Sequence, residues 1–239
     1  VKGLLNCYGI PSTILRVREF GGPDYNDRVS TDLQRRFTYA LDFKGSQYIE
    51  HQWTTDNLSG KVPETIEFRF RTPKRQNQTI IQKGNEWAIS LLDGGVTNKG
   101  MLKFQLSGSS DKFFITSSTQ QFYNDEMWSV MLTRRSASGA DLSDDNVSRD
   151  VTYELVTKHY DATRLKINYE TSSCFSTSSI DLNGAFTSST AVYIGGKGAT
   201  FDGNNFSGSI MEYRLWTEPL SESKFDNHVK TPKAYNCLL

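Results

Sequence analysis

The most constraining part of the chain lies near its C-terminal end, where strand, turn and strand signals follow one another in a fixed order. Val192 and Ile194 alternate with polar or exposed positions, and the pair Gly195–Gly196 then provides the positive φ that a tight turn needs. A second strand is predicted from Phe206 to Trp216. Pro219 ends that strand, because proline donates no hydrogen bond to a neighbouring strand.

A short helix is predicted directly after this strand. Ser221 is a suitable N-cap, and Leu220 and Phe225 occupy the two positions of a hydrophobic staple around the first turn. Basic residues, among them His228, favour the C-terminal half of the helix, and Pro232 follows as a stop. This end of the chain is therefore predicted to be two strands and one helix.

This order of signals resembles the closing strands of laminin G-like and pentraxin-like jelly rolls, which belong to the concanavalin A-like superfamily. The residues that carry the resemblance are Ile194-Gly195-Gly196, Phe206-Ser207-Gly208-Ser209-Ile210, Glu212, Arg214-Leu215-Trp216 and Leu220-Ser221. One departure is Met211, where many relatives have an aspartate. The resemblance implies an all-β fold, a two-sheet antiparallel jelly-roll sandwich with a short C-terminal helix.

Two earlier segments extend the resemblance to about residues 37–230. Residues 40–49 are similar to the family's opening strand, with Leu41 and Phe43 on one face. Residues 124–134 are similar to a strand that begins with a tryptophan, here Trp128, although the histidine that often follows in relatives is Ser129 in this chain. A laminin G-like domain flanked by linkers resembles those of large bacteriophage virion proteins.

Several other segments show the hydrophobic patterns of strands. In residues 65–71, Ile66, Phe68 and Phe70 point one way, while Glu67, Arg69 and Arg71 point the other way, which predicts a half-buried strand with a solvated charged face. Residues 113–115 are expected to supply a further inward row.

The length of 239 residues fits one main sandwich with additional segments at its ends. We expect residues 1–36 to be an N-terminal arm or linker, residues 37–230 to be the sandwich, and residues 231–239 to be an exit segment that joins it to further polypeptide. No apolar run approaches the roughly 20 residues that span a bilayer, and the chain starts without a signal-peptide pattern. Either it is not exported by that route or the sequence lacks the native start.

The net charge limits the classes of binding partner, and the cysteine content bears on the redox state of the compartment. Lys+Arg and Asp+Glu are 27 each, so no net field attracts nucleic acid or anionic lipid, and neither nucleic-acid binding nor membrane insertion is expected. Cys7, Cys174 and Cys237 are interpreted as free thiols of a reducing compartment or of a virion assembled in one, with a bridge between Cys7 and Cys237 left open. No cysteine or histidine spacing indicates zinc.

Catalytic patterns are missing from the sequence. The histidines His51, His159 and His228 do not stand in a nucleophile-activating context. The Glu-x-Asp-x-x-Glu strand motif of glucanases with this fold is also absent, since Glu64 and Glu67 lack the middle aspartate. We therefore expect a protein that is not an enzyme.

Calcium is the one cofactor for which the sequence offers ligands. Asp202, Asn204 and Asn205 have the hard oxygen atoms that Ca²⁺ prefers, and so does the acidic loop with Asp141, Asp144 and Asp145. Many laminin G and pentraxin domains bind calcium through loops at the rim of one sheet, but no family ligand maps onto these positions. The run 202–205 is equally typical of a turn, so both interpretations stay open.

Carbohydrate binding needs exposed aromatic rings beside polar groups. Trp53, Tyr123 and Tyr160 are the candidates, because they lie outside the alternating strand rows, although packing under a loop is the alternative for each. Trp87, Trp128 and Trp216 are assigned to the core.

The functional hypothesis combines these points. It describes a virion surface or tail component whose sandwich contacts other virion proteins, or further copies of itself in a symmetric assembly, or a host-surface glycan. The alternative is a secreted carbohydrate-binding or adhesion module of a cellular organism, located outside the cell.

Overall fold

A computed structural model of the chain describes residues 39–53, 60–107, 112–136, 142, 151–161, 166–178, 184–198, 201 and 203–230. The predicted arm (1–36) and exit segment (231–239) lie outside these residues, as do Cys7 and Cys237, so the domain boundaries stay predictions. None of the described helices is long and apolar enough to cross a membrane.

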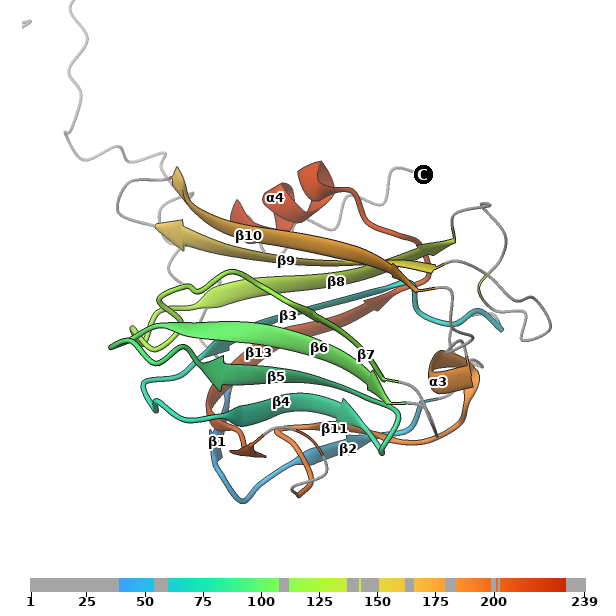
Figure 1. Cartoon of the computed structure of the whole chain (residues 1–239), viewed down its shortest axis with the longest axis horizontal. Helices are drawn as coiled ribbons and strands as arrows, with labels where there is room; N and C mark the ends of the chain where they lie inside the picture. Colours follow the sequence, from blue (N-terminus) through green and yellow to red (C-terminus); the bar gives the residue numbers. More distant parts are fainter. Residues whose placement is uncertain are drawn as a thin grey trace, which may run out of the picture. The chain divides into compact units, whose positions relative to one another are not determined.

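Two sheets form the fold (Figure 1). The first sheet has the order β1-β13-β3-β8-β9-β10. Its strands are β1 (Leu41–Lys44), β13 (Ser207–Trp216), β3 (Thr65–Arg71), β8 (Trp128–Ser136), β9 (Val151–Asp161) and β10 (Lys166–Ser178). The second sheet has the order β2-β11-β4-β5-β6-β7, with β12 paired to β4. Its strands are β2 (Ile49–His51), β11 (Val192–Ile194), β4 (Gln78–Lys83), β5 (Trp87–Asp93), β6 (Gly100–Ser107), β7 (Lys112–Thr116) and β12 (Asn204–Asn205).

All strand pairs are antiparallel except the short pair of β12 with β4. The apolar side chains that the two sheets turn toward one another form one core, which includes Trp87 and Trp128 as predicted. The short helix α3 (Gly184–Thr187) adds Phe186, whose ring stacks on Trp87 with 5.7 Å between centroids. The prediction of a two-sheet antiparallel sandwich is confirmed.

The predicted C-terminal helix is α4 (Glu222–Lys230), and its first turn has the expected chemistry. The Ser221 hydroxyl accepts the backbone N–H of Lys224 at 3.4 Å, as an N-cap does. Leu220 and Phe225 are buried together with Met131, Val156 and Val229, in an apolar cluster between the helix and the outer face of the first sheet. The sequence-based assignment of cap and staple is therefore correct.

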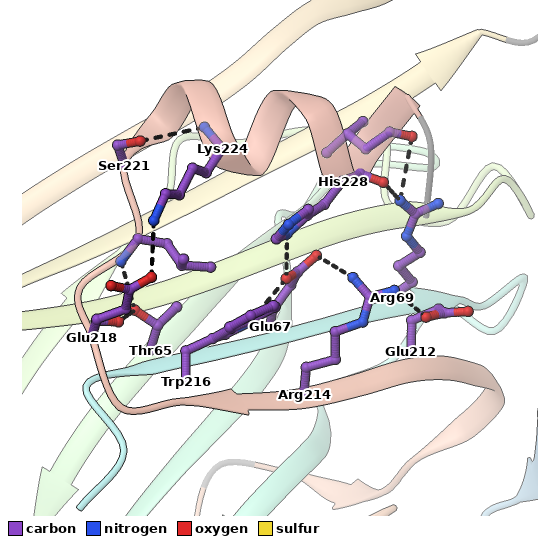
Figure 2. A network of polar contacts seen from close by, with 12 residues as sticks. Thr65, Glu67, Arg69, Glu212, Arg214, Trp216, Glu218, Ser221, Lys224 and His228 are labelled. Atoms are coloured by element: carbon purple, nitrogen blue, oxygen red, sulfur yellow. Dashed lines mark hydrogen bonds and ion pairs between the residues drawn. The ribbon is translucent and has the colours of Figure 1, made fainter. Parts of the chain in front are cut away.

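The charged face of β3 is solvated only at Arg71, and not at Glu67 and Arg69 as predicted. Glu67 is 1% exposed and Arg69 is 3% exposed, because α4 covers this face (Figure 2). Glu67 accepts hydrogen bonds from Arg214 Nη1 at 3.2 Å and from Trp216 Nε1 at 3.2 Å, and it lies 2.9 Å from His228 Nδ1. An ionised carboxylate only accepts, so the His228 Nδ1 atom carries a proton in this pair.

Two further basic side chains hold the helix at its ends. Arg69 donates to the carbonyl oxygens of His228 and Val229, which are among the last of α4 (Figure 2). Burial lowers the pKa of Arg69 to about 10, against the raising effect of Glu67, so the guanidinium stays charged at neutral pH. Lys158 of β9 forms ion pairs with Glu222 and Asp226 near the start of the helix.

We predict that Ser221→Ala lowers the free energy of unfolding by about 1 kcal/mol, because the Lys224 N–H loses its cap. Urea unfolding followed by tryptophan fluorescence measures the change. Asn227→Ala, an exposed position on the same helix, is the control and is expected to stay within about 0.5 kcal/mol. A Ser221→Ala variant as stable as that control contradicts the cap.

Candidate functional site

The outer face of the second sheet carries a straight row of side chains. In β11, Val192 and Ile194 point into the core, so Tyr193 between them points outward. The strand register continues this row through six strands, one residue from each. Its members, in order from β2 to β7, are Glu50, Tyr193, Gln82, Ala88, Gln105 and Phe114.

The middle of this outer-face row combines a small side chain with hydrogen-bonding groups. Ala88 lies between Gln82 and Gln105, so an amide side chain stands on each side of it. Ser90, Thr79 and Lys103 follow in the next row, and the hydroxyl groups of Thr79 and Ser90 are 3.5 Å apart. The centre of the face is therefore polar but closely packed, since Thr79, Gln82, Ala88 and Ser90 are each at most 3% exposed.

Aromatic rings stand near both ends of the row. At one end, the Tyr48 ring meets the Tyr193 ring nearly at a right angle, with 5.6 Å between centroids, and Tyr48 is 42% exposed. At the other end, Phe114 is 59% exposed, and the Lys103 Nζ atom lies 5.2 Å from its ring centroid. Both ends thus present aromatic carbon to the solvent.

The position of Phe114 corrects the prediction of an inward row at residues 113–115. Phe113 packs against the core and Ile115 is part of it, whereas Phe114 points to the outer face. Strand alternation allows only every second residue of such a run to face inward.

The candidate sugar-binding residues from the sequence lie elsewhere. Trp53 is 3% exposed, and its Nε1 atom donates to the Phe186 carbonyl oxygen at 2.6 Å. Tyr123 is 4% exposed, its hydroxyl donates to the Gln76 carbonyl oxygen at 3.0 Å, and burial raises its pKa to about 12. Tyr160 is partly buried against the apolar cluster under α4. The three rings do not share an exposed platform, and Trp53 and Tyr123 have the packing role that was the alternative.

The calcium candidates are only partly described. Asp202 and the acidic loop with Asp141, Asp144 and Asp145 lie outside the described residues. The Asn204 N–H donates to the Asn77 carbonyl oxygen at 2.9 Å, and the Asn205 Oδ1 atom accepts the Gly198 N–H at 3.0 Å. Within the described part of the chain, no three His, Cys, Asp or Glu side chains are grouped to hold a metal ion. A calcium site at residues 202–205 remains a prediction.

The histidines have other partners than a nucleophile. His228 is bound to Glu67, and His159 Nε2 lies 3.0 Å from a carboxylate oxygen of Glu126. The His51 ring meets the Tyr213 ring with 6.4 Å between centroids.

The residues that the sequence analysis missed are Tyr193, Gln82, Gln105 and Phe114. A local signal existed for two of them, because Tyr193 and Phe114 each stand between two inward-facing apolar residues of a strand. No local signal places the two glutamines beside them, since that depends on the register of several strands.

Comparison with known proteins gives a structural similarity that identifies the fold. No protein-family model and no curated protein matches the sequence. Among solved structures, the chain is similar to the LG1-3 region of the laminin alpha2 chain, with 14% sequence identity and a TM-score of 0.50. The match covers 77% of this chain and 32% of that one, so the chain spans about a third of the laminin structure. The chain therefore has a laminin G-like jelly-roll fold.

Proposed function

We propose that the chain is a non-catalytic glycan-binding module and that the outer face of the second sheet is its binding surface. The observation that carries this proposal is the outer-face row, with the exposed rings of Tyr48 and Phe114 near its ends and the partly exposed amide of Gln105 between them. Aromatic rings pack against the C–H faces of sugars, and amide groups donate to and accept from sugar hydroxyls.

The dimensions of the row suit a short linear oligosaccharide. Neighbouring strands are about 4.8 Å apart, which is close to the length of one pyranose unit in an extended chain. Tyr193 in β11 and Phe114 in β7 are separated by β4, β5 and β6. A glycan lying across the strands would therefore reach from one ring to the other with roughly four sugar units.

The state of Glu67 supports binding over catalysis. A glycosidase on this fold needs carboxylates on an open strand face. Glu67 is instead covered by α4 and engaged by Arg214, Trp216 and His228, so it meets no substrate.

The proposal also includes the place where the module is displayed. We infer display on a virion surface or tail, in contact with other virion proteins or further copies of the chain, and a secreted adhesion module is the alternative. Electron microscopy and intact mass of the native source material distinguish the two settings. A free, monomeric cytosolic protein would contradict both.

We predict that Tyr193→Ala lowers the affinity for a bound tetrasaccharide about tenfold, and that Phe114→Ala has a similar effect, because each removes a stacking ring. A glycan array identifies the ligand, and titration calorimetry measures the affinities. Tyr39→Ala removes an exposed ring outside the row and serves as the control. Full affinity of the Tyr193→Ala variant, or an array without any binding, would refute the proposed function.

A further inference from the structure

At the β2 end of the outer-face row, an ammonium group already lies against two rings and near a carboxylate. The Lys197 Nζ atom is 4.3 Å from the ring centroid of Tyr193 and 5.3 Å from that of Tyr48. The same Nζ atom is 3.9 Å from a carboxylate oxygen of Glu50. We name Tyr48, Glu50 and Tyr193 the ammonium site.

The chemistry of this site favours a cation. The face of an aromatic ring attracts an ammonium group, and two rings at a steep angle present two such faces to one charge. Glu50 adds a negative charge on the same side of β2. A hydrogen bond with the Tyr193 hydroxyl raises the pKa of Lys197, which agrees with a site that stabilises positive charge.

Lys197 is attached so that its side chain can leave without its backbone. The Gln82 Oε1 atom accepts the Lys197 N–H at 3.1 Å, and Gln82 Nε2 donates to the Lys197 carbonyl oxygen at 3.4 Å. These two bonds hold the peptide groups, while the side chain of Lys197 is 44% exposed and has room to rotate into solvent. The lysine is thus an internal occupant that a ligand can replace.

We propose that the ammonium site takes the free amino group of an amino sugar, and that Lys197 fills the site while no glycan is bound. This inference rests on the proposed glycan-binding function, because Tyr193 belongs both to the outer-face row and to the ammonium site. The sugar ring stacks on Tyr193, and its ammonium group replaces the Lys197 Nζ atom between the rings and Glu50.

A neutral sugar gains less at this position. A hydroxyl group or an N-acetyl group carries no positive charge, so it would displace Lys197 and leave Glu50 without a cation near it. The site therefore discriminates between a free amine and its acetylated form, which differ in charge.

The test compares three tetrasaccharides, of glucosamine, of N-acetylglucosamine and of glucose, at a pH below the pKa of the sugar amine. Titration calorimetry with the full chain is expected to show the tightest binding for the glucosamine tetramer. Lys197→Ala should strengthen that binding about tenfold, because an internal competitor is removed, and Glu50→Gln should weaken it by a similar factor. Glu50→Gln should change the affinity for the acetylated tetramer by no more than about twofold, because an N-acetyl group carries no charge for Glu50 to attract.

Tetramethylammonium chloride probes the cation chemistry without a sugar. It is expected to shift the aromatic NMR signals of Tyr48 and Tyr193 in the Lys197→Ala variant, and much less in the unaltered chain, where Lys197 competes. No shift in the Lys197→Ala variant would overturn the ammonium site.

The outcomes separate this inference from the proposed function. Equal binding of the acetylated and free-amine tetramers, unchanged by Lys197→Ala and Glu50→Gln, overturns the ammonium site and leaves a glycan-binding module. Binding of none of the three tetramers overturns the amino-sugar inference, and an array without any bound glycan overturns the proposed function as well.

Discussion

Replacing Gly208 by alanine is expected to lower the free energy of unfolding by at least about 3 kcal/mol. Gly208 lies opposite Phe43 in the pairing of β13 with β1 and has a φ of 153°, which L side chains rarely adopt. An added Cβ would overlap the carbonyl oxygen of Arg71 and would lie 2.8 Å from the Phe206 ring. The carbonyl belongs to β3 and the ring is buried, so neither moves aside easily. Urea unfolding followed by tryptophan fluorescence measures the effect.

Gly198→Ala is the matched control for this prediction. Gly198 also has a positive φ, of 84°, but an added Cβ meets no atom within 4 Å. Only the backbone cost remains, which is about 1–2 kcal/mol. If both variants lose the same free energy of unfolding, the close approach of β13 to β3 is not the reason that position 208 needs glycine.

The second large effect is expected for Glu67→Gln, a loss of about 3 kcal/mol or more. The substitution keeps the shape of the side chain and removes the negative charge that Arg214 and His228 face (Figure 2). Arg214 would then keep only the carboxylate of Glu212, and His228 would lose the carboxylate that it faces. The loss appears in urea unfolding, and circular dichroism of the aromatic residues reports on the packing of Trp216 against His228.

Glu222→Gln tests whether burial is the cause. Glu222 lies on α4, like His228, and is paired with Lys158 of β9, but more than half of its side chain is exposed. Water screens such a pair, so we expect a loss of at most about 1 kcal/mol. Similar losses for Glu67→Gln and Glu222→Gln would mean that the network under α4 is no more important than a surface ion pair.

The sequence was sufficient for the elements whose chemistry is local. The turn at Gly195–Gly196, with φ values of 99° and 79°, and the capped start of α4 at Ser221 are both present as predicted. Each depends on residues a few positions apart, and the residue types needed there are few. The same applies to the alternation of Ile66, Phe68 and Phe70, which face the core as expected.

The element that covers a strand face cannot be predicted from the residues of that strand alone. The alternation in β3 correctly places Glu67 and Arg69 opposite the core, but it says nothing of α4, whose His228 meets Glu67 across 161 positions of sequence. The burial of Trp53 under Phe186, 133 positions away, was hidden for the same reason. Contacts of this kind follow from the sheet order, which hydrophobic patterns do not determine.

The candidate site is the least predictable part. The outer-face row draws one residue from each of six strands, and it exists only because five strand registers align. A shift of one residue in β4 would turn Gln82 inward and break the row. Nothing in the sequence distinguishes Tyr48 and Phe114, whose rings lie near the two ends of the row, from other aromatic residues of strands.

Because α4 covers the outer face of one sheet, and no described helix packs on the outer face of the other, the module has a front and a back. If the front binds glycan as proposed, one copy is expected to hold an oligosaccharide weakly, since an open sheet face encloses little of the ligand. In an assembly whose copies all present their fronts on the same side, each copy after the first binds from an already attached assembly. The avidity of such an assembly would exceed the affinity of one copy by about 10²–10⁴-fold. Because α4 covers the back of each copy, several copies could bind one glycan-bearing surface only if all their fronts faced that surface.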